Sequence, residues 1–218
     1  DQRLVRRDHA LIQLLDPPFD RSALDPGYIR GYVPGVRENG GQYTHGAIWA
    51  AMAFAAIGDR TRAWEMMAMI NPVNHARTLD GVANYRAEPY VVAADVYAMA
   101  PHTGRGGWSW YTGSAGWMYR LIVESLLGVT LSDGHLRFAP CLPVDWTAFS
   151  MRYRHRGTTY AIAIRQAFAV GDTRVQATRV TVDGVLQPDS SVVLVDDGTE
   201  HQVLVEIACR LTKAVRAG

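Results

Sequence analysis

Two short segments of this chain carry residues that could bind an anion, and each lies where a helical pattern starts. The first is Glu38 to His45, and the second is Gly104 to Ala115. The start of a helix leaves backbone N–H groups unpaired and carries a partial positive charge, so it attracts anions. The first helix start offers the imidazole of His45, and the second offers the hydroxyl of Thr112 with the N–H of Gly113. Three aromatic side chains beside the second suit the faces of sugar rings: Trp108, Trp110 and Tyr111. Together these residues predict a site for an anion and a sugar.

Each of these residues also has an ordinary structural explanation. Taken alone, His45 fits a core or capping histidine, and Thr112 fits a helix N-cap. Arg37 and Glu38 fit a surface ion pair, which would contribute little stability. Asp95 lies in a stretch of Val, Ala and Tyr and needs a partner if it is buried. The remaining histidines show no metal-ligand spacing, so we expect no metal site.

The composition excludes several function classes. The 218 residues carry a formal net charge of +1, which argues against a broad nucleic-acid or membrane-surface footprint. Hydrophobic residues make up 48% and charged residues 20%, as in ordinary globular proteins, and no apolar run approaches the length of a membrane span. The only cysteines, Cys141 and Cys209, leave one disulfide open, but two buried thiols are favoured.

The hydrophobic period changes near residue 130. Before it, apolar residues recur at helical spacing, and after it they alternate as in strands, with Asp183-Gly184 and Asp197-Gly198 as turn signals. Asp59 is a plausible N-cap for one of the helices. The chain is therefore predicted to be α+β, with a helical domain over 1–130 and an antiparallel β-sandwich over 131–218. The predicted helices are Leu4 to Leu15, Ala47 to Ile57, Arg62 to Ile70, Tyr90 to Met99 and Gly116 to Leu127, and the predicted strands are 136–138, 151–155, 160–165, 175–182, 192–195 and 203–207.

Four motifs resemble the C-terminal part of glycoside hydrolase family 94, the inverting phosphorylases of β-linked gluco-oligosaccharides. They are residues 31–45, 85–97 and 104–119, and the stretch from Phe138 to Trp146, which is similar to the Pro-Cys-x-Pro-x-x-Trp start of the family's last β domain. Within the family, they look most like the phosphorylase-like region of cyclic β-1,2-glucan synthases. The resemblance implies an (α/α)6 barrel followed by a jelly-roll-like β domain. Residues 1–130 would supply about five or six of the twelve helices.

The resemblance also implies roles for individual residues. In the family, phosphate is held by residues that match His45, Thr112 and Gly113. The acceptor sugar is bound by residues that match Tyr32, Arg37 and Glu38. Relatives that act on cellobiose carry Lys in place of Arg37 and Gln in place of Ala94, so the resemblance does not fix the linkage or the exact sugar contacts.

No residue of this chain matches the family's general acid, an aspartate in the first part of the barrel. We therefore expect the acid and a further phosphate-binding arginine to lie upstream, in a longer polypeptide, and this chain to be inactive alone. The expected partners are a β-glucan oligosaccharide, inorganic phosphate as a substrate, and the upstream part of the same polypeptide. No cofactor and no nucleic acid are expected, and a homodimer is compatible with the sequence. The expected location is the cytoplasm, with the upstream region as a potential tether to the inner membrane.

The chemistry fits these residue types. An inverting glycosidase needs one acid for the leaving oxygen and one base for water, whereas in a phosphorylase phosphate is itself the nucleophile. Attack from the opposite face would convert a β-glucoside into α-glucose 1-phosphate. Two other functions stay open at this point: an inverting hydrolase, and a non-catalytic module that binds glucan or controls its chain length.

Overall fold

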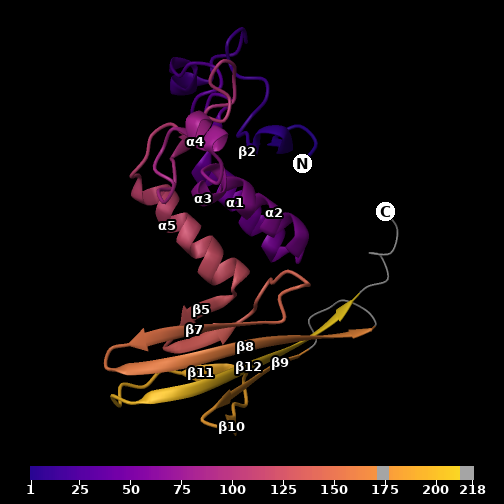
Figure 1. The fold of residues 1–218 in the computed structure, drawn as a ribbon, viewed down its shortest axis with the longest axis vertical. Coiled ribbons are helices and arrows are strands. Elements are labelled where there is room, and N and C mark those ends of the chain that lie inside the picture. Colours follow the sequence, from indigo (N-terminus) through magenta and orange to yellow (C-terminus); the bar gives the residue numbers. More distant parts are fainter. Residues whose placement is uncertain (171–176, 212–218) are drawn as a thin grey trace. The chain divides into compact units, whose positions relative to one another are not determined.

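Helices gather in the first part of the chain and long strands in the second, as the ribbon of the computed structural model shows (Figure 1). The structure describes residues 1–170 and 177–211. Its internal contacts divide the chain into two units, Asp1–Leu126 and Leu127–Gly218. The mixed helix-and-strand class predicted from the sequence is therefore confirmed, whereas the (α/α)6 barrel stays a prediction.

The first unit is built around one cluster of helices joined by long loops. Short strands and 3-10 turns come before the first helix, one more short strand comes before the last helix, and that last helix continues as a π-helix over Leu121–Leu126. The helices are α1 (Thr44–Ala56), α2 (Arg60–Ile70), α3 (Pro72–His75), α4 (Leu79–Tyr85) and α5 (Thr112–Arg120); the 3-10 turns are η1 (Arg7–His9) and η2 (Gly27–Gly31); the strands are β1 (Val5–Arg6), β2 (Leu11–Ile12), β3 (Gln42–Tyr43) and β4 (Asp95–Val96).

The core of this unit packs α1 against α2, α5 and the π-helix. Ile48 of α1, Ala63 of α2 and Leu121 of the π-helix are fully buried in one hydrophobic cluster. Small alanine side chains let α1 approach its neighbours closely, and alanine has the best helix propensity. Asp59 caps α2 as predicted, because its Oδ1 accepts a hydrogen bond from the N–H of Arg62 at 3.1 Å. The packing of α1 and α5 sets the positions of His45 and Thr112.

Two of the predicted helices are wrong. The stretch from Leu4 to Leu15 forms the antiparallel pair β1–β2, which buries Val5, Leu11 and Ile12. The stretch from Tyr90 to Met99 is extended, and its strand β4 pairs with β3. In both stretches the apolar spacing suits a helix, but strand pairing buries the same side chains. The strands β1 and β2 pair with each other within the first stretch, whereas β4 pairs with the distant strand β3.

The described part of the second unit forms two sheets. The five-stranded sheet has the order β10-β9-β12-β8-β7, and the three-stranded sheet has the order β11-β6-β5. The strands are β5 (Val129–Ser132), β6 (His135–Phe138), β7 (Ala148–His155), β8 (Thr158–Val170), β9 (Ala177–Val182), β10 (Val185–Leu186), β11 (Ser191–Val193) and β12 (Glu200–Leu211). All six predicted strands are present, although positions 175 and 176 of one lie outside the described residues. The jelly-roll topology stays a prediction.

Alternating burial explains why these strands form. On β8, Tyr160, Ile162 and Ile164 are buried, and on β12 Val203 and Val205 are buried, so every second residue faces the core. The expectation of purely antiparallel pairing is wrong at one place, because β12 runs parallel to β8 from Glu200↔Thr159 onward. The chain forms β9, β10 and β11 before it returns as β12 between β8 and β9. That long excursion supplies the crossover that a parallel pair needs.

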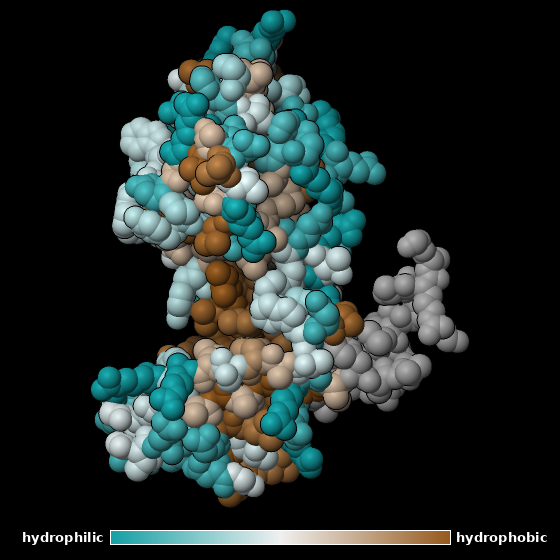
Figure 2. Space-filling model, in the orientation of Figure 1, coloured by the Kyte–Doolittle hydropathy of each residue, from teal (hydrophilic) through white to brown (hydrophobic). Residues whose placement is uncertain are grey.

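The expectation that Cys141 and Cys209 are two buried thiols stays a prediction. Cys141 is partly buried in the second unit, and the side chain of Cys209 lies outside the described residues. Among the described residues, no helix is long and apolar enough to cross a membrane. Figure 2 shows hydrophilic residues over much of the visible face of each unit, with apolar patches among these hydrophilic residues.

A histidine joins the two predicted turns of the second unit. His201 lies between two carboxylates, with Nδ1 2.7 Å from Asp183 Oδ2 and Nε2 3.0 Å from Asp197 Oδ2. Its ring stacks on Tyr160 at 5.3 Å, and Nε2 also lies 3.4 Å from the Thr199 hydroxyl. A carboxylate can only accept, so bonds at both ring nitrogens require the charged imidazolium. The hydrogen bond with Asp183 is the largest of the effects that raise the pKa of His201. The hydrogen bond that Asp197 accepts from the N–H of Thr199 is the largest of the effects that lower the pKa of Asp197 to about 2.

We expect the melting temperature to fall as the pH rises above about 6.5, the ordinary pKa of histidine. The folded state binds this proton more tightly than the unfolded state, so the stabilisation is complete below that pH and is lost as the pH rises through the folded pKa. The measurement is a thermal unfolding series from acid to mildly alkaline pH on the wild type and on His201→Asn. The variant should lose much of this pH dependence, while His155→Asn, a histidine change on β7, should keep it. Identical slopes for the wild type and His201→Asn would contradict the account.

Candidate functional site

A tight loop over residues 35–41 presents Arg37 and Glu38. The N–H of Gly35 donates to the carbonyl of Asn39 at 2.7 Å, and the N–H of Gly41 donates to the carbonyl of Arg37 at 3.1 Å. A Cβ on Gly41 would lie 2.8 to 3.0 Å from backbone atoms of Arg37 and Gly35, so only glycine fits there. Arg37 has a φ of 49°, in the left-handed region that non-glycine residues seldom adopt. The loop therefore holds Arg37 in a costly conformation.

Asn39, in the middle of the Glu-Asn-Gly motif, holds the loop from inside. It is completely buried, its amide donates to the carbonyl of Tyr32 at 2.8 Å, and its Oδ1 accepts from the N–H of Phe19 at 2.7 Å. A buried amide with these partners fixes one conformation, because leaving either group unpaired is costly. Asn39 thus ties the 35–41 loop to Tyr32.

Arg37 lies at the centre of an aromatic cluster. Its Cζ is 5.3 Å from the ring centre of Tyr32, 5.6 Å from that of Trp108 and 5.8 Å from that of Tyr111, all within the range of cation–π attraction. Its Nε donates to Glu38 Oε2 at 3.4 Å, and both side chains are largely buried, with 16% and 14% exposed. Burial lowers the pKa of Arg37, but the Tyr111 hydrogen bond and the Glu38 charge outweigh it and the pKa is raised. The predicted sugar residues Tyr32, Arg37 and Glu38 thus come together.

The segment before α5 supplies the exposed aromatic rings. Trp110 is 70% exposed and has a φ of 64°, the second non-glycine residue of the site in the left-handed region. Its indole N–H donates to Glu88 Oε1 at 2.9 Å, and this bond lowers the pKa of Glu88. Trp108 and Tyr111 meet edge to face with ring centres 5.7 Å apart. Unusual backbone conformations gather at binding sites, and here two of them flank one cluster of rings.

The first turn of α5 follows these rings directly. Thr112 and Gly113 are exposed, and no side chain caps the helix at Tyr111. A Cβ on Gly113 would meet nothing within 4 Å, so the space around its backbone is open. A hollow of about 250 Å³ adjoins this turn, lined by Tyr90, Val91, Val92, Trp110, Tyr111, Thr112 and Ala115. The free N–H groups of a helix start are therefore accessible beside the aromatic cluster.

His45, the second residue of α1, lies in another aromatic cluster. Its ring centre is 4.5 Å from Trp49 and 5.5 Å from Trp117 of α5, and 6.0 Å from Tyr43. Its Nε2 is buried and has no hydrogen-bond partner among the residues that the structure describes. A buried polar atom without a partner is rare and is explained by a water or a bound ligand. His45 reaches α5 at Trp117, five residues, or about 7.5 Å of helix rise, beyond Thr112.

Three carboxylates near the site are already engaged. Glu38 pairs with Arg37, and Glu88 accepts from Trp110 with a lowered pKa, which favours its charged form. Asp95 is fully buried, and both of its oxygens accept backbone N–H bonds. A general acid needs a proton to donate and reach to the leaving oxygen. None of these three carboxylates has that arrangement.

Sequence reasoning missed the role of Asp95, although it singled the residue out. The signal was a charge in an apolar stretch, and the partners are the backbone N–H groups of Arg37 and Trp108. No group of three or more His, Cys, Asp or Glu side chains in the described part of the chain is suited to hold a metal ion.

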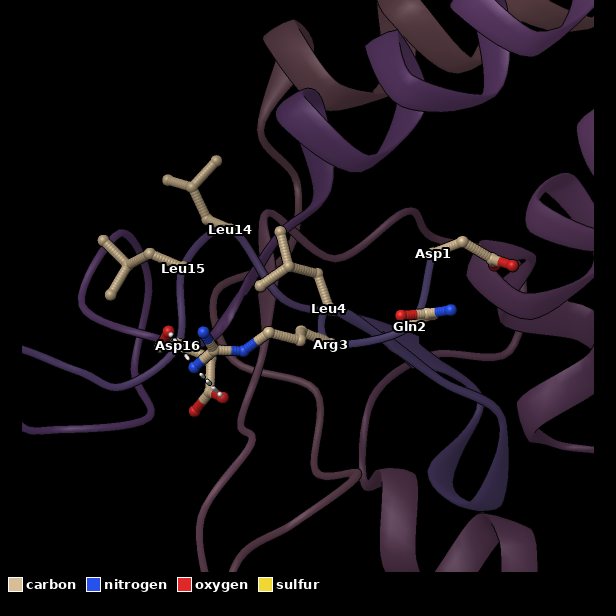
Figure 3. Close-up of a pocket in the computed structure, with 7 residues that line it drawn as sticks. All are labelled: Asp1, Gln2, Arg3, Leu4, Leu14, Leu15 and Asp16. Carbon is tan, nitrogen blue, oxygen red and sulfur yellow. Dashed lines mark hydrogen bonds and ion pairs between the residues drawn. The ribbon is translucent and has the colours of Figure 1, made fainter.

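Another hollow of the first unit lies among residues that contribute nothing to these clusters. It has a volume of about 650 Å³ and is formed at the start of the chain and after β2. Figure 3 shows Arg3 reaching toward Asp16 across it, with an N–O distance of 3.6 Å, and leucine side chains along its wall. It contains none of the predicted site residues.

The comparisons with known proteins agree with the motifs. Residues 2–128 match the catalytic domain of the glycosyl hydrolase 94 superfamily, and residues 130–184 match the C-terminal domain of glycosyl hydrolase family 65. The chain is 45% identical over 187 residues to the cyclic beta-(1,2)-glucan synthase NdvB of Rhizobium meliloti (strain 1021), covering 84% of this chain and 7% of that protein.

Two phosphorylases are also similar. The chain is 31% identical to the solabiose phosphorylase of Paenibacillus borealis, over 88% of this chain and 24% of that protein. It is 31% identical to the 1,2-beta-oligoglucan phosphorylase of Listeria innocua serovar 6a, over 66% of this chain and 16% of that protein. The chain thus spans about a quarter or less of the length of these relatives. The resemblance seen in the motifs is confirmed, and the chain belongs to the glycosyl hydrolase 94 superfamily.

Proposed function

We propose that this chain provides the phosphate- and acceptor-binding part of an inverting β-glucan phosphorylase. The observation that carries the proposal is the cluster of Tyr32, Arg37 and Glu38 against Trp108 and Tyr111, because Tyr111 leads directly into the open first turn of α5. A sugar-binding surface and an anion-binding helix start thus adjoin. The relatives named as phosphorylases support this pairing of ligands.

In this proposal, phosphate binds the first turn of α5 and the imidazole of His45. The N–H of Gly113 and the hydroxyl of Thr112 donate to phosphate oxygens, and the helix start adds its partial positive charge. The unpartnered Nε2 of His45 donates to the same ligand. These groups hold the anion without a competing negative charge, so phosphate stays nucleophilic.

The acceptor sugar binds against the 35–41 loop. The guanidinium of Arg37 is a planar fork of donors, and Glu38 accepts, a combination that matches adjacent sugar hydroxyls. The ring of Trp108, 57% exposed, provides a face for the pyranose. Similarity to a cyclic β-1,2-glucan synthase and a 1,2-β-oligoglucan phosphorylase favours a β-1,2-linked glucan.

Phosphate then attacks the anomeric carbon from the face opposite the leaving sugar. The C–O bond to that sugar breaks, a C–O bond to phosphate forms, and inversion gives α-glucose 1-phosphate. The departing oxygen takes a proton from a general acid outside this chain, because Glu38, Glu88 and Asp95 are engaged. The chain on its own is then inactive.

Thr112→Ala and His45→Ala are the variants that test the phosphate site, in the full-length enzyme as its gene encodes it. Each removes one hydrogen bond to a charged ligand, which is typically worth roughly 1.5–3 kcal/mol, so the KM for phosphate should rise about ten-fold or more. The KM for glucan should change little. Thr112→Ser keeps the hydroxyl and serves as the matched control. Equal changes in both KM values would show that the two residues are only structural.

A further inference from the structure

Asp95 connects the two segments that form the acceptor cluster. It lies on β4 opposite Tyr43 of β3 and is completely buried. Its Oδ2 accepts the N–H of Arg37 at 3.3 Å, and its Oδ1 accepts the N–H of Trp108 at 3.1 Å. One carboxylate thus holds the backbones of two residues that are distant in the sequence.

The residues held in this way are those whose side chains meet. The guanidinium of Arg37 lies over the ring of Trp108 at 5.6 Å, although neither backbone pairs with the other in a strand. Arg37 has its left-handed φ of 49° where its N–H points to Asp95. A conformation of this kind persists only where the surroundings impose it. Asp95 is a group that imposes it.

Gly107 makes room for the carboxylate. Its N–H donates to the carbonyl of Asp95 at 2.8 Å, and any Cβ at this position would collide with the carboxylate, its Oδ2 lying only 2.8 Å away. Real Cβ atoms essentially never approach other atoms this closely. The glycine before Trp108 therefore lets the segment rest directly on Asp95.

An amide cannot replace this carboxylate. Both oxygens accept from N–H donors, whereas an asparagine would turn an NH₂ group toward one of them. Burial is the largest influence on the pKa of Asp95 and raises it, while the two backbone N–H groups and Arg37 act in the opposite direction. The two contacts are strongest in the charged form, in which both oxygens act only as acceptors.

We propose that Asp95 is a positioning residue for the acceptor sugar, because it sets the backbones of Arg37 and Trp108 so that guanidinium and indole present one fixed surface. This inference rests on the acceptor role proposed for Arg37. Asp95 does not touch the sugar and acts through the two side chains that it places. Its effect should therefore fall on acceptor binding and leave the phosphate contacts of Thr112 and Gly113 as they are.

The test is Asp95→Asn in the full-length enzyme, assayed in the synthetic direction with glucose 1-phosphate as the donor and in the phosphorolytic direction with inorganic phosphate. The KM for the acceptor should rise about ten-fold, while the KM for phosphate stays within about two-fold, since one buried hydrogen bond is lost at the acceptor surface. Asp59→Asn is the matched control. It makes the same change at a carboxylate that accepts a backbone N–H from Arg62, at the start of α2.

A second variant keeps the test decisive if Asp95→Asn does not fold. Gly107→Ala places a Cβ against the carboxylate of Asp95 and should also raise the KM for the acceptor. The Cβ of Gly116→Ala in α5 meets nothing within 4 Å, so this control variant should keep the wild-type KM. Folded variants with a wild-type KM for the acceptor, or with equal shifts in both KM values, would overturn the inference. A wild-type enzyme that shows no phosphate-dependent turnover would instead overturn the proposed function.

Discussion

Glu38→Gln is expected to slow synthesis from glucose 1-phosphate about 100-fold at low acceptor concentration and to change the preference among acceptor sugars. Glu38 and Arg37 are largely buried and paired at 3.4 Å. Removing one member of a largely buried, hydrogen-bonded charge pair costs roughly 2–5 kcal/mol, much of it from the charge left unpaired. Arg37 would then lack its counter-charge where it should bind sugar hydroxyls. The measurement is initial rate against acceptor concentration for several sugars.

The control for this variant is Glu65→Gln. Glu65 also pairs with an arginine, since Arg7 Nε lies 2.6 Å from its Oε1, but it lies on α2, outside the acceptor cluster. This variant should keep the wild-type preference and rate. Glu38→Gln should also leave the KM for phosphate nearly unchanged. A Glu38→Gln enzyme with wild-type acceptor preference and rate would remove Tyr32, Arg37 and Glu38 from the site.

The sequence predicts the long elements well because their patterns are strong. The strands β7, β8 and β12 alternate over many residues, and burial on one face follows from it. Helices α1 and α2 are long and rich in alanine and methionine, which favours buried helices. The stretches 4–15 and 90–99 are different. Their apolar residues fit a helix equally well, and strand pairing decides their structure: within the stretch itself at 4–15, and with the distant strand β3 at 90–99. In the stretch 90–99, Asp95 is the residue that argues against a helix. A buried carboxylate on a helix would lack its backbone partners, the N–H groups of Arg37 and Trp108.

The residues of the site could be predicted only as motifs. The sequence shows Arg37 and Glu38 in one segment and Trp108 and Tyr111 in another, but no local pattern says that they meet. Their meeting depends on Asn39 and Asp95, which bind backbone groups far away in the chain. The same limit applies to the sheet, where alternation predicts β8 and β12 but not that they run parallel.

The proposed contact of His45 and Thr112 with one phosphate rests partly on the sequence and partly on the structure. The sequence resemblance places both at one phosphate, and the structure links them through α5, where Trp117 stacks on His45. The buried Nε2, which has no hydrogen-bond partner among the described residues, is the local sign that supports the phosphate contact proposed for His45. That sign could not have been seen in the sequence, because it depends on Trp49 and Trp117 enclosing the ring.

The central claim is that phosphate is the nucleophile, and the products made with and without phosphate test it most directly. The full-length enzyme would be incubated with linear β-1,2-glucan, and the products would be followed by phosphorus and proton NMR. We predict that α-glucose 1-phosphate forms at a rate that depends on the phosphate concentration, with almost no cleavage in its absence, because in the proposed mechanism phosphate takes the place of the activated water. Release of free glucose at the same rate with and without phosphate, or binding of glucan with no turnover in either case, would contradict the account.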